Sequence, residues 1–322
     1  MSHSQGSQPV GASPSARQTP NMDQLKRESL VDFGGLDKMY REGQVHVVRR
    51  WSGQDSAPPS VSIIIPAFNE SRRLPISVPR LLSVIDLETT EVIVVDDGSR
   101  DGTGGVAADL LNDLRHGAVL RLNENAGKGA AVRAGVAHAR GTSTVFMDAD
   151  LATDPGDIFG LLDGLDRADV VIGSRAAPGA SVENAPWMRA VMGWTFNRFL
   201  RSVTGLELRD TQCGFKAFRT PLAKLLFSRS RIDGFAIDVE ILLLARRIGL
   251  VVEEVPVRWR HQPGSQVSPV RDSLAMVSDV VRLRRGGWSK AIPSIAVQVH
   301  GDGEPARPAI GVAFDSVAAI EG

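Results

Sequence analysis

The sequence predicts an α/β fold with a Rossmann-like, mostly parallel central sheet that is flanked by helices. The apolar runs VSIIIPAF (61–68) and VIVVD (92–96) are continuous, which is typical of strands buried on both faces of a parallel sheet. Each run is followed by a segment whose apolar residues recur at helical spacing, and this alternation indicates a doubly wound sheet. We therefore expect one such domain over residues 58–288.

In the first half of this domain, residues 58–176, strands and helices alternate along the chain. Strands are expected at 61–68, 91–97, 118–123, 145–150 and 168–175. Helices are expected between them, at 74–85, 106–114, 125–140 and 158–165.

In the second half, residues 177–288, the regular alternation of strands and helices ends. It is expected to contain a loop at 177–186, a long helix at 187–205, a compact polar segment at 209–219, helices at 221–227, 234–249 and 268–285, and a strand at 250–260. The flanking segments 1–57 and 289–322 are expected to be disordered or peripheral, apart from a short helix and strand within 21–57.

Composition excludes several classes of protein. The 322 residues include 37 basic and 37 acidic side chains, and this balance argues against a protein that coats nucleic acid. The single cysteine, Cys213, excludes an intrachain disulfide. No apolar run approaches the ~18–20 residues that span a bilayer, and the first residues lack the apolar core of a signal peptide. We expect a cytoplasmic protein, which would visit the membrane surface if its substrate is a lipid.

Two aspartates, Asp148 and Asp150, end the strand expected at 145–150. Ligands of open α/β sheets bind at the carboxyl ends of the strands. Carboxylates at such an end suit Mg²⁺ or Mn²⁺, and such an ion suits a diphosphate. Taken alone, a solvated acidic loop is the simpler explanation of an Asp-x-Asp sequence.

Polar residues at the other strand ends favour a binding site. They are Asn69, Glu70, Asp96, Asp97, Asn125, Lys128, Ser174 and Arg175. Because parallel strands end on one rim, we expect these side chains to meet in one crevice. Glu70 and Asp97 suit a ribose or base, and Gly127-Lys128-Gly129 opens a helix whose N–H groups and ammonium suit phosphate. The spacing of these residues fits neither a P-loop nor a dinucleotide-binding fingerprint.

Six motifs occur in the order typical of one family: VSIIIPAFNE, VIVVDDGSRDGT, NAGKGAAVRAG, MDAD, IGSR and DTQCGFKAF. Together they resemble family 2 glycosyltransferases of the GT-A fold, over roughly residues 60–285. Within that family they resemble the dolichyl-phosphate β-glucosyltransferases and bacterial polyprenyl-phosphate counterparts. The segment DTQCGFK (210–216) is the most specific of the six and favours the glucose branch over the mannose branch.

The resemblance implies a role for each matching residue. The nucleotide sugar would be held by Pro66, Phe68, Glu70, Asp97, Lys128, Asp148 and Gln212. Asp148 and Asp150 would bind Mg²⁺ or Mn²⁺, and Arg175 and Arg189 would hold the phosphate of a polyprenyl-phosphate acceptor. Such an acceptor is already an anion and needs no general base, whereas Asp210 is the candidate base for a hydroxyl acceptor. The implied reaction is inverting transfer of glucose from UDP-glucose to the lipid phosphate.

Two departures from the family pattern bear on these roles. Mannose-type relatives carry a metal-binding glutamine where this chain has Ala152, so that water or another group must complete the metal shell. Many relatives carry a lysine where this chain has Gln266, and its phosphate contact would fall to Arg258, Arg260, His261 or Arg271.

Two other functions stay open from sequence. One is transfer of mannose or another sugar, to lipid phosphate or to a saccharide hydroxyl. The other is a non-catalytic protein that binds sugar nucleotides. The helices at 187–205 and 268–285 mix apolar with basic residues, which suits either an anionic membrane surface or the edge of the core. The sequence does not fix the oligomeric state.

Overall fold

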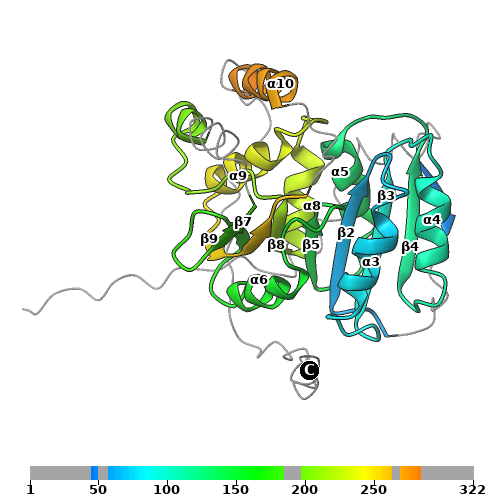
Figure 1. Cartoon of the computed structure of the whole chain (residues 1–322). Coiled ribbons are helices and arrows are strands. Elements are labelled where there is room, and N and C mark those ends of the chain that lie inside the picture. Colours follow the sequence, from blue (N-terminus) through cyan, green and yellow to red (C-terminus); the bar gives the residue numbers. More distant parts are fainter. Residues whose placement is uncertain (1–44, 50–56, 185–196, 263–268, 284–322) are drawn as a thin grey trace, which may run out of the picture.

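The computed structural model describes residues 45–49, 57–184, 197–262 and 269–283 (Figure 1). Eight strands form a single central sheet in the order β1-β4-β3-β2-β5-β8-β6-β9. Their bounds are β1 Val45–Arg49, β2 Val61–Ala67, β3 Thr90–Asp96, β4 Gly117–Leu122, β5 Ser143–Met147, β6 Val170–Ser174, β8 Phe215–Arg219 and β9 Val252–Pro256. Only β1 and β8 run antiparallel to their neighbours. The expected mostly parallel sheet is therefore confirmed.

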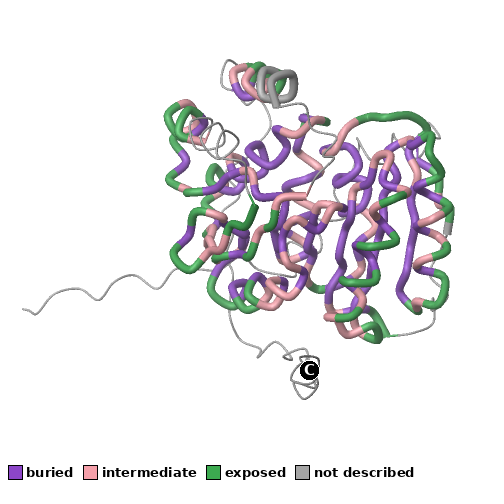
Figure 2. Tube along the Cα trace, in the orientation of Figure 1, coloured by how far each residue is buried: buried purple, intermediate pink, exposed green. Residues whose placement is uncertain are grey.

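Helices cover both faces of this sheet. One face packs against α5 (Lys128–His138), α8 (Thr220–Arg229) and α9 (Ile237–Arg247), and the other against α3 (Leu74–Leu82), α4 (Thr103–Leu110) and α6 (Ile158–Gly164). Neighbouring residues of a strand point to opposite faces, so Ile64 lies in the first core and Ile63 in the second. Both cores are buried along the length of the strands (Figure 2).

The expectation of a compact polar segment at 209–219 was wrong for its second part. Phe215–Arg219 forms β8, which runs antiparallel between β5 and β6 in the middle of the sheet. Phe215 and Ala217 face one core and Phe218 the other. Lys216 made this stretch look polar, but its side chain is completely buried and ion-paired, as described below.

Two further segments differ from expectation. The strand expected at 250–260 is divided at Val257 into β9 and β10 (Arg258–Arg260). β10 pairs in parallel with β7 (Ser181–Glu183), which lies in the segment expected to be a loop. Because β10 leaves the central sheet, Trp259 comes to lie beside the end of β5, where Thr153 forms an isolated bridge with it.

At the periphery, β1 pairs with β4, which confirms the strand that was expected on the domain edge within 21–57. Of the helix expected at 187–205, residues 197–204 are described and are helical. The helix expected at 268–285 is present as α10 (Pro269–Arg282). Within the described ranges, no helix combines the length and the apolar character that crossing a bilayer requires.

Candidate active site

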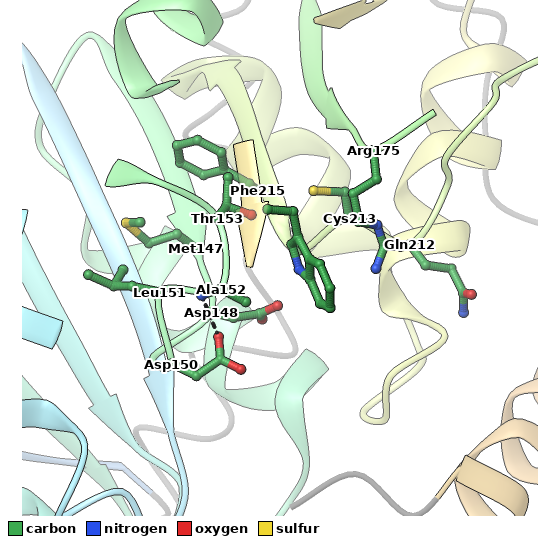
Figure 3. Close-up of a pocket in the computed structure, with 12 residues that line it drawn as sticks. Met147, Asp148, Asp150, Leu151, Ala152, Thr153, Arg175, Gln212, Cys213 and Phe215 are labelled. Carbon is green, nitrogen blue, oxygen red and sulfur yellow. Dashed lines mark hydrogen bonds between the residues drawn. The ribbon is translucent and has the colours of Figure 1, made fainter. Parts of the chain in front are cut away.

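The strands β2 to β6 all end on one rim of the sheet, as expected (Figure 1). At that rim the structure has a small cavity beyond the end of β5 (Figure 3). Its lining comes from four separate parts of the chain: the end of β5 and the segment after it (within 147–153), Arg175 after β6, residues 212–215 at the start of β8, and Trp259 of β10. The predicted residues Asp148, Asp150, Arg175 and Gln212 are thus brought together.

Asp148 and Asp150 form an acidic pair in the cavity, and nearby positive charges offset the negative charge of Asp150 only in part. Burial and the neighbouring charge of Asp148 raise the pKa of Asp150, although its Oδ1 accepts a hydrogen bond of 3.0 Å from the Ala152 backbone N–H. A carboxylate that repels its neighbour in this way favours a cation between them. Leu151, which follows Asp150, adopts a left-handed backbone conformation, with φ of 45°.

This pair fits a divalent metal whose other ligands come from substrate and water. Among the described residues, no group of three or more His, Cys, Asp or Glu side chains is arranged to hold an ion. Mg²⁺ is commonly bound through one or two carboxylates plus substrate phosphates rather than by a complete protein cage. The side chain of Asp148 is 47% exposed, so it remains accessible to such an ion.

Asp148 is the first of a row of four charged side chains of alternating sign that leads into the protein: Asp148, Lys128, Asp238 and Lys216. Lys128 Nζ lies 2.9 Å from Asp148 Oδ1 and 3.0 Å from Asp238 Oδ2. The other oxygen of Asp238 accepts a hydrogen bond from the ammonium of Lys216, which also donates to the Cys213 carbonyl. Burial opposes the ionised form of Asp238, but the two lysines outweigh it and lower its pKa. Likewise, Asp148 and Asp238 outweigh burial and raise the pKa of Lys128.

Asp238 and Lys216 were missed by the reasoning from sequence. The available signal was a charged residue inside an otherwise apolar element, at 215–218 for Lys216 and at 236–239 for Asp238. Two such residues of opposite sign, both on buried elements, satisfy the rule that buried charges are paired.

Gly214 allows the segment before β8 to approach Asp148 closely. A side chain at this position would overlap the Asp148 carboxylate. The close approach places Gln212 and Cys213 in the wall of the cavity (Figure 3). The Gln212 side chain itself turns toward α10, where its Nε2 lies 3.1 Å from Met276 Sδ. Burial raises the pKa of the Cys213 thiol to about 11, in agreement with its interpretation as a packing residue.

Arg175 is held in place by Asp210 and Trp259. Its backbone N–H, Nε and Nη2 donate to the Asp210 carboxylate at 2.7–3.1 Å, and its guanidinium carbon lies 5.7 Å from the Trp259 ring centre. Burial acts to raise the pKa of Asp210, but Arg175 outweighs it and the pKa is lowered. A carboxyl group with a lowered pKa that is bound to an arginine is a weak general base. The geometry therefore favours an acceptor that needs no base.

The residues predicted to hold the nucleoside lie at the ends of β2 and β3. Pro66 and Phe68 are partly exposed, and the Glu70 carboxylate pairs with Arg73 at 2.9 Å. Asp97 is buried and accepts hydrogen bonds from Asn125 Nδ2 and from the backbone N–H groups of Ala126 and Gly127, at 2.8–3.1 Å. Burial raises its pKa to about 6 despite these bonds. Asp97 thus organises the loop that leads to Lys128.

One predicted phosphate contact needs correction. The N–H groups that open α5 were expected to face phosphate, but the Gly127 N–H donates to Asp97 and the Gly129 N–H to the Asp233 carbonyl. A Cβ on Gly127 would overlap the carbonyl oxygen of Asp233, and a Cβ on Gly129 would overlap that of Ile232. These glycines therefore serve close packing, and of the groups predicted to face phosphate in this motif the Lys128 ammonium is the one that lies at the site, beside Asp148.

The remaining predicted contacts are occupied or lie outside the described residues. Arg258 pairs with Asp154 and Asp157, and Arg260 pairs with Glu183. Arg189 and Gln266 lie outside the described ranges, as does the side chain of Arg271. His261 is partly buried beside Trp259, with 6.0 Å between their ring centres.

Comparison with known proteins decides the family. Residues 62–227, about half of the chain, match the model of glycosyl transferase family 2. The chain belongs to glycosyl transferase family 2. This assignment, together with the named relatives below, makes it a glycosyltransferase and confirms the resemblance given by its motifs.

Relatives of this glycosyltransferase share most of its length. The dolichyl-phosphate β-glucosyltransferase of Drosophila melanogaster is 37% identical over 258 residues, covering 73% of this chain and 78% of the relative. The human protein of the same name is 33% identical over 257 residues, covering 73% and 79%.

Solved structures show the same fold. Glucosyl-3-phosphoglycerate synthase from Mycobacterium tuberculosis, in complex with UDP, superposes with a TM-score of 0.54 at 21% identity, covering 70% of this chain and 79% of that one. The same synthase with Mn²⁺, UDP and phosphoglyceric acid gives a TM-score of 0.53 at 20% identity, covering 69% and 76%. The GT-A architecture expected from the motifs is thereby confirmed.

Proposed function

We propose that this glycosyltransferase transfers glucose from UDP-glucose to a polyprenyl phosphate of the dolichyl type, with inversion at the anomeric carbon. The observation that carries the proposal is the identity of 30–37% to proteins named dolichyl-phosphate β-glucosyltransferase over most of the chain. The cavity supports it, because acidic and basic groups of the required kinds meet there.

The acidic side of the cavity would receive the donor. Asp148 and Asp150 would hold Mg²⁺ or Mn²⁺, which supplies Lewis-acid stabilisation of the departing diphosphate when bound. Lys128 adds a positive charge beside Asp148. Asp97 shapes the preceding loop, and Glu70 and Arg73 lie paired at the end of β2.

The basic side would receive the acceptor. Asp210 binds the Nε–Nη2 edge of the Arg175 guanidinium and, with Trp259, orients it. The acceptor phosphate would bind the other edge, formed by Nη1 and Nη2. Arg189 is proposed as the second arginine, from its motif position. A phosphate monoester is an anionic nucleophile at neutral pH, so the chain needs to orient it rather than deprotonate it. This agrees with the engagement of Asp210 by Arg175.

We also propose that the protein works at the cytoplasmic face of a membrane, to which it binds peripherally. Support comes from the described part of the second half, where Arg198 and Arg201 are exposed on the helix at 197–204 and Phe199 is 39% exposed. Basic and apolar side chains on one helix suit an anionic lipid surface.

The function is tested by transfer assays with the purified protein, Mn²⁺ or Mg²⁺, and dolichyl phosphate. Radiolabelled UDP-glucose and GDP-mannose are supplied in separate reactions, with EDTA controls. We expect an organic-extractable, metal-dependent product from UDP-glucose alone. Label from GDP-mannose would contradict the choice of sugar, and labelling of a saccharide instead of the lipid would contradict the acceptor.

Arg189→Ala is expected to raise the KM for dolichyl phosphate about 10-fold and to leave the KM for UDP-glucose within about 2-fold, since a charge-assisted bond is worth about 1.5–3 kcal/mol. Initial rates measured with each substrate varied in turn check this expectation. Arg115→Ala is the control, because Arg115 is an exposed arginine that precedes β4, at the opposite end of the sheet from the rim, and pairs with Glu88. It should change neither KM by more than about 2-fold. Equal increases in both KM values would contradict the assigned role.

Donor binding is expected to weaken as pH falls below about 6. Asp97 has a pKa of about 6, and its protonated form loses hydrogen bonds from Ala126, Gly127 or Asn125. UDP-glucose affinity, measured by calorimetry from pH 5 to 8, should fall up to about 10-fold per pH unit below this value. Asp97→Asn should bind more weakly and give a flatter profile.

The sign of the stability effect separates this expectation from acid unfolding. An aspartate whose pKa rises on folding binds more protons in the native state, so between pH 4 and 6 its contribution to stability increases as pH falls. Loss of donor binding that coincides with a fall in Tm would therefore argue against Asp97 as the cause.

A further inference from the structure

We propose that Asp238 is a positioning residue for the metal site: it holds the Lys128 ammonium away from full pairing with Asp148 and so keeps that carboxylate available to a divalent cation. The inference rests on the proposed metal site at Asp148 and Asp150. It assigns a role in that site to a residue on α9, a helix that contributes nothing to the lining of the cavity.

The position of Lys128 is the first part of the argument. Its Nζ stands almost equally far from two carboxylates, 2.9 Å from Asp148 and 3.0 Å from Asp238. These carboxylates differ in environment, because the side chain of Asp148 is 47% exposed and that of Asp238 only 4%. The less exposed carboxylate attracts an ammonium more strongly, since water screens it less. Asp238 therefore draws Lys128 inward.

Lys216 is the second part. It is completely buried, and its ammonium binds the Asp238 oxygen that Lys128 does not use. Lys216 also donates to the Cys213 carbonyl, in the segment that lines the cavity. Asp238 thus binds Lys128 at the start of α5, and through Lys128 it is linked to Asp148 after β5. Through Lys216 it is linked to the segment before β8.

The charges show why this arrangement matters for a cation. The charges of Asp148, Lys128, Asp238 and Lys216 sum to zero. The charge of Asp150 therefore leaves the cavity with one net negative charge. Without the charge of Asp238 the sum at the cavity becomes zero, and Lys128 has Asp148 as its only remaining carboxylate partner among the contacts described. Both changes oppose binding of a divalent cation at Asp148.

Three variants separate the positioning of Lys128 from net charge and from folding. Asp238→Asn removes the carboxylate and leaves Lys216 buried without its partner, so its Tm should fall. Lys216→Met removes the buried cation, so that Asp238 keeps Lys128 as its lysine partner. The double variant Asp238→Asn/Lys216→Met has the same net charge as the wild type and no unpaired buried lysine, and we expect its Tm to recover toward the wild-type value.

The measurement is Mn²⁺ binding to the full chain, with UDP at fixed concentration, followed by the electron paramagnetic resonance signal of free Mn²⁺. A protein-free sample corrects for Mn²⁺ bound by UDP. We expect Asp238→Asn and the double variant to bind Mn²⁺ about 10-fold more weakly, in line with the effect of residues that orient metal ligands. Lys216→Met should bind at least as tightly as the wild type.

Glu240→Gln is the matched control, because Glu240 is a second buried acid on α9. Its carboxylate accepts hydrogen bonds from the backbone N–H groups of Arg231 and Ile232, and not from Lys128. This variant should lower Tm and leave Mn²⁺ affinity within about 2-fold.

The outcomes are distinct. Wild-type affinity in the double variant would overturn the inference, because net charge alone would then explain the effect of Asp238. Equal weakening in Lys216→Met or Glu240→Gln would also overturn it, in favour of a general packing defect. A wild-type protein that binds no Mn²⁺ with UDP would overturn the metal site itself, and with it this inference.

Discussion

Asp150→Ala is expected to reduce turnover at least about 1000-fold while leaving the fold intact. Removing a metal ligand withdraws several kcal/mol of stabilisation from the departing diphosphate, and about 1.4 kcal/mol corresponds to a factor of ten. Burial and the charge of Asp148 raise the pKa of Asp150, so these surroundings disfavour its ionised form. Its loss should therefore change Tm by no more than a few degrees.

Thermal melts with and without ligand check this separation of activity from stability. A ligand that binds the native state stabilises it by an amount that grows with the logarithm of the ligand concentration relative to its Kd. Mn²⁺ with UDP should raise the Tm of the wild type and have little effect on Asp150→Ala. An inactive variant whose Tm still rises as in the wild type would place the metal elsewhere.

Gly214→Ala is expected to lower kcat/KM about 100-fold. A methyl group there overlaps the Asp148 carboxylate, which must move. A displacement of about 1 Å in a reacting group costs a factor of this order. The loss should be accompanied by weaker Mn²⁺ binding in the assay described above.

Gly105→Ala provides the control for Gly214→Ala. Gly105 lies in α4, and no atom lies within 4 Å of the position that its Cβ would take. This substitution should leave activity unchanged and raise the free energy of unfolding by about 0.5–1 kcal/mol, the usual gain of alanine over glycine in a helix. Comparable activity losses in both variants would contradict the assigned role of Gly214.

The sequence predicted the parallel part of the fold well because each of its strands is an unbroken apolar run. The same logic placed Asp148, Asp150 and Arg175 together, since they follow parallel strands that end on one rim. It failed for β8, where Lys216 interrupts the apolar pattern. A lysine inside an apolar run signals a buried charge, but the sequence does not show which acid pairs with it, because Asp238 lies on a helix that is distant in the sequence.

The same limit applies to the site. A sequence shows that Arg175 and Asp210 are charged, but not that they bind each other, and this pairing makes Asp210 a weaker candidate for a base. The sequence likewise shows two glycines around Lys128, but not that the backbone of Ile232 and Asp233 fills the space beside them. Such contacts join elements that only the three-dimensional fold brings together.

The antiparallel strand β8 has a consequence for how the chain acquires its fold. It lies between β5 and β6, so these two strands share no hydrogen bonds and are joined only through Phe215–Arg219. A fragment that ends near residue 176 would leave both with exposed edges, which invite aggregation. We expect residues 58–176 not to fold as an independent unit, although they supply most of the donor side. During synthesis, the sheet can close only after β8 has been made, which ties completion of the catalytic rim to the second half of the chain.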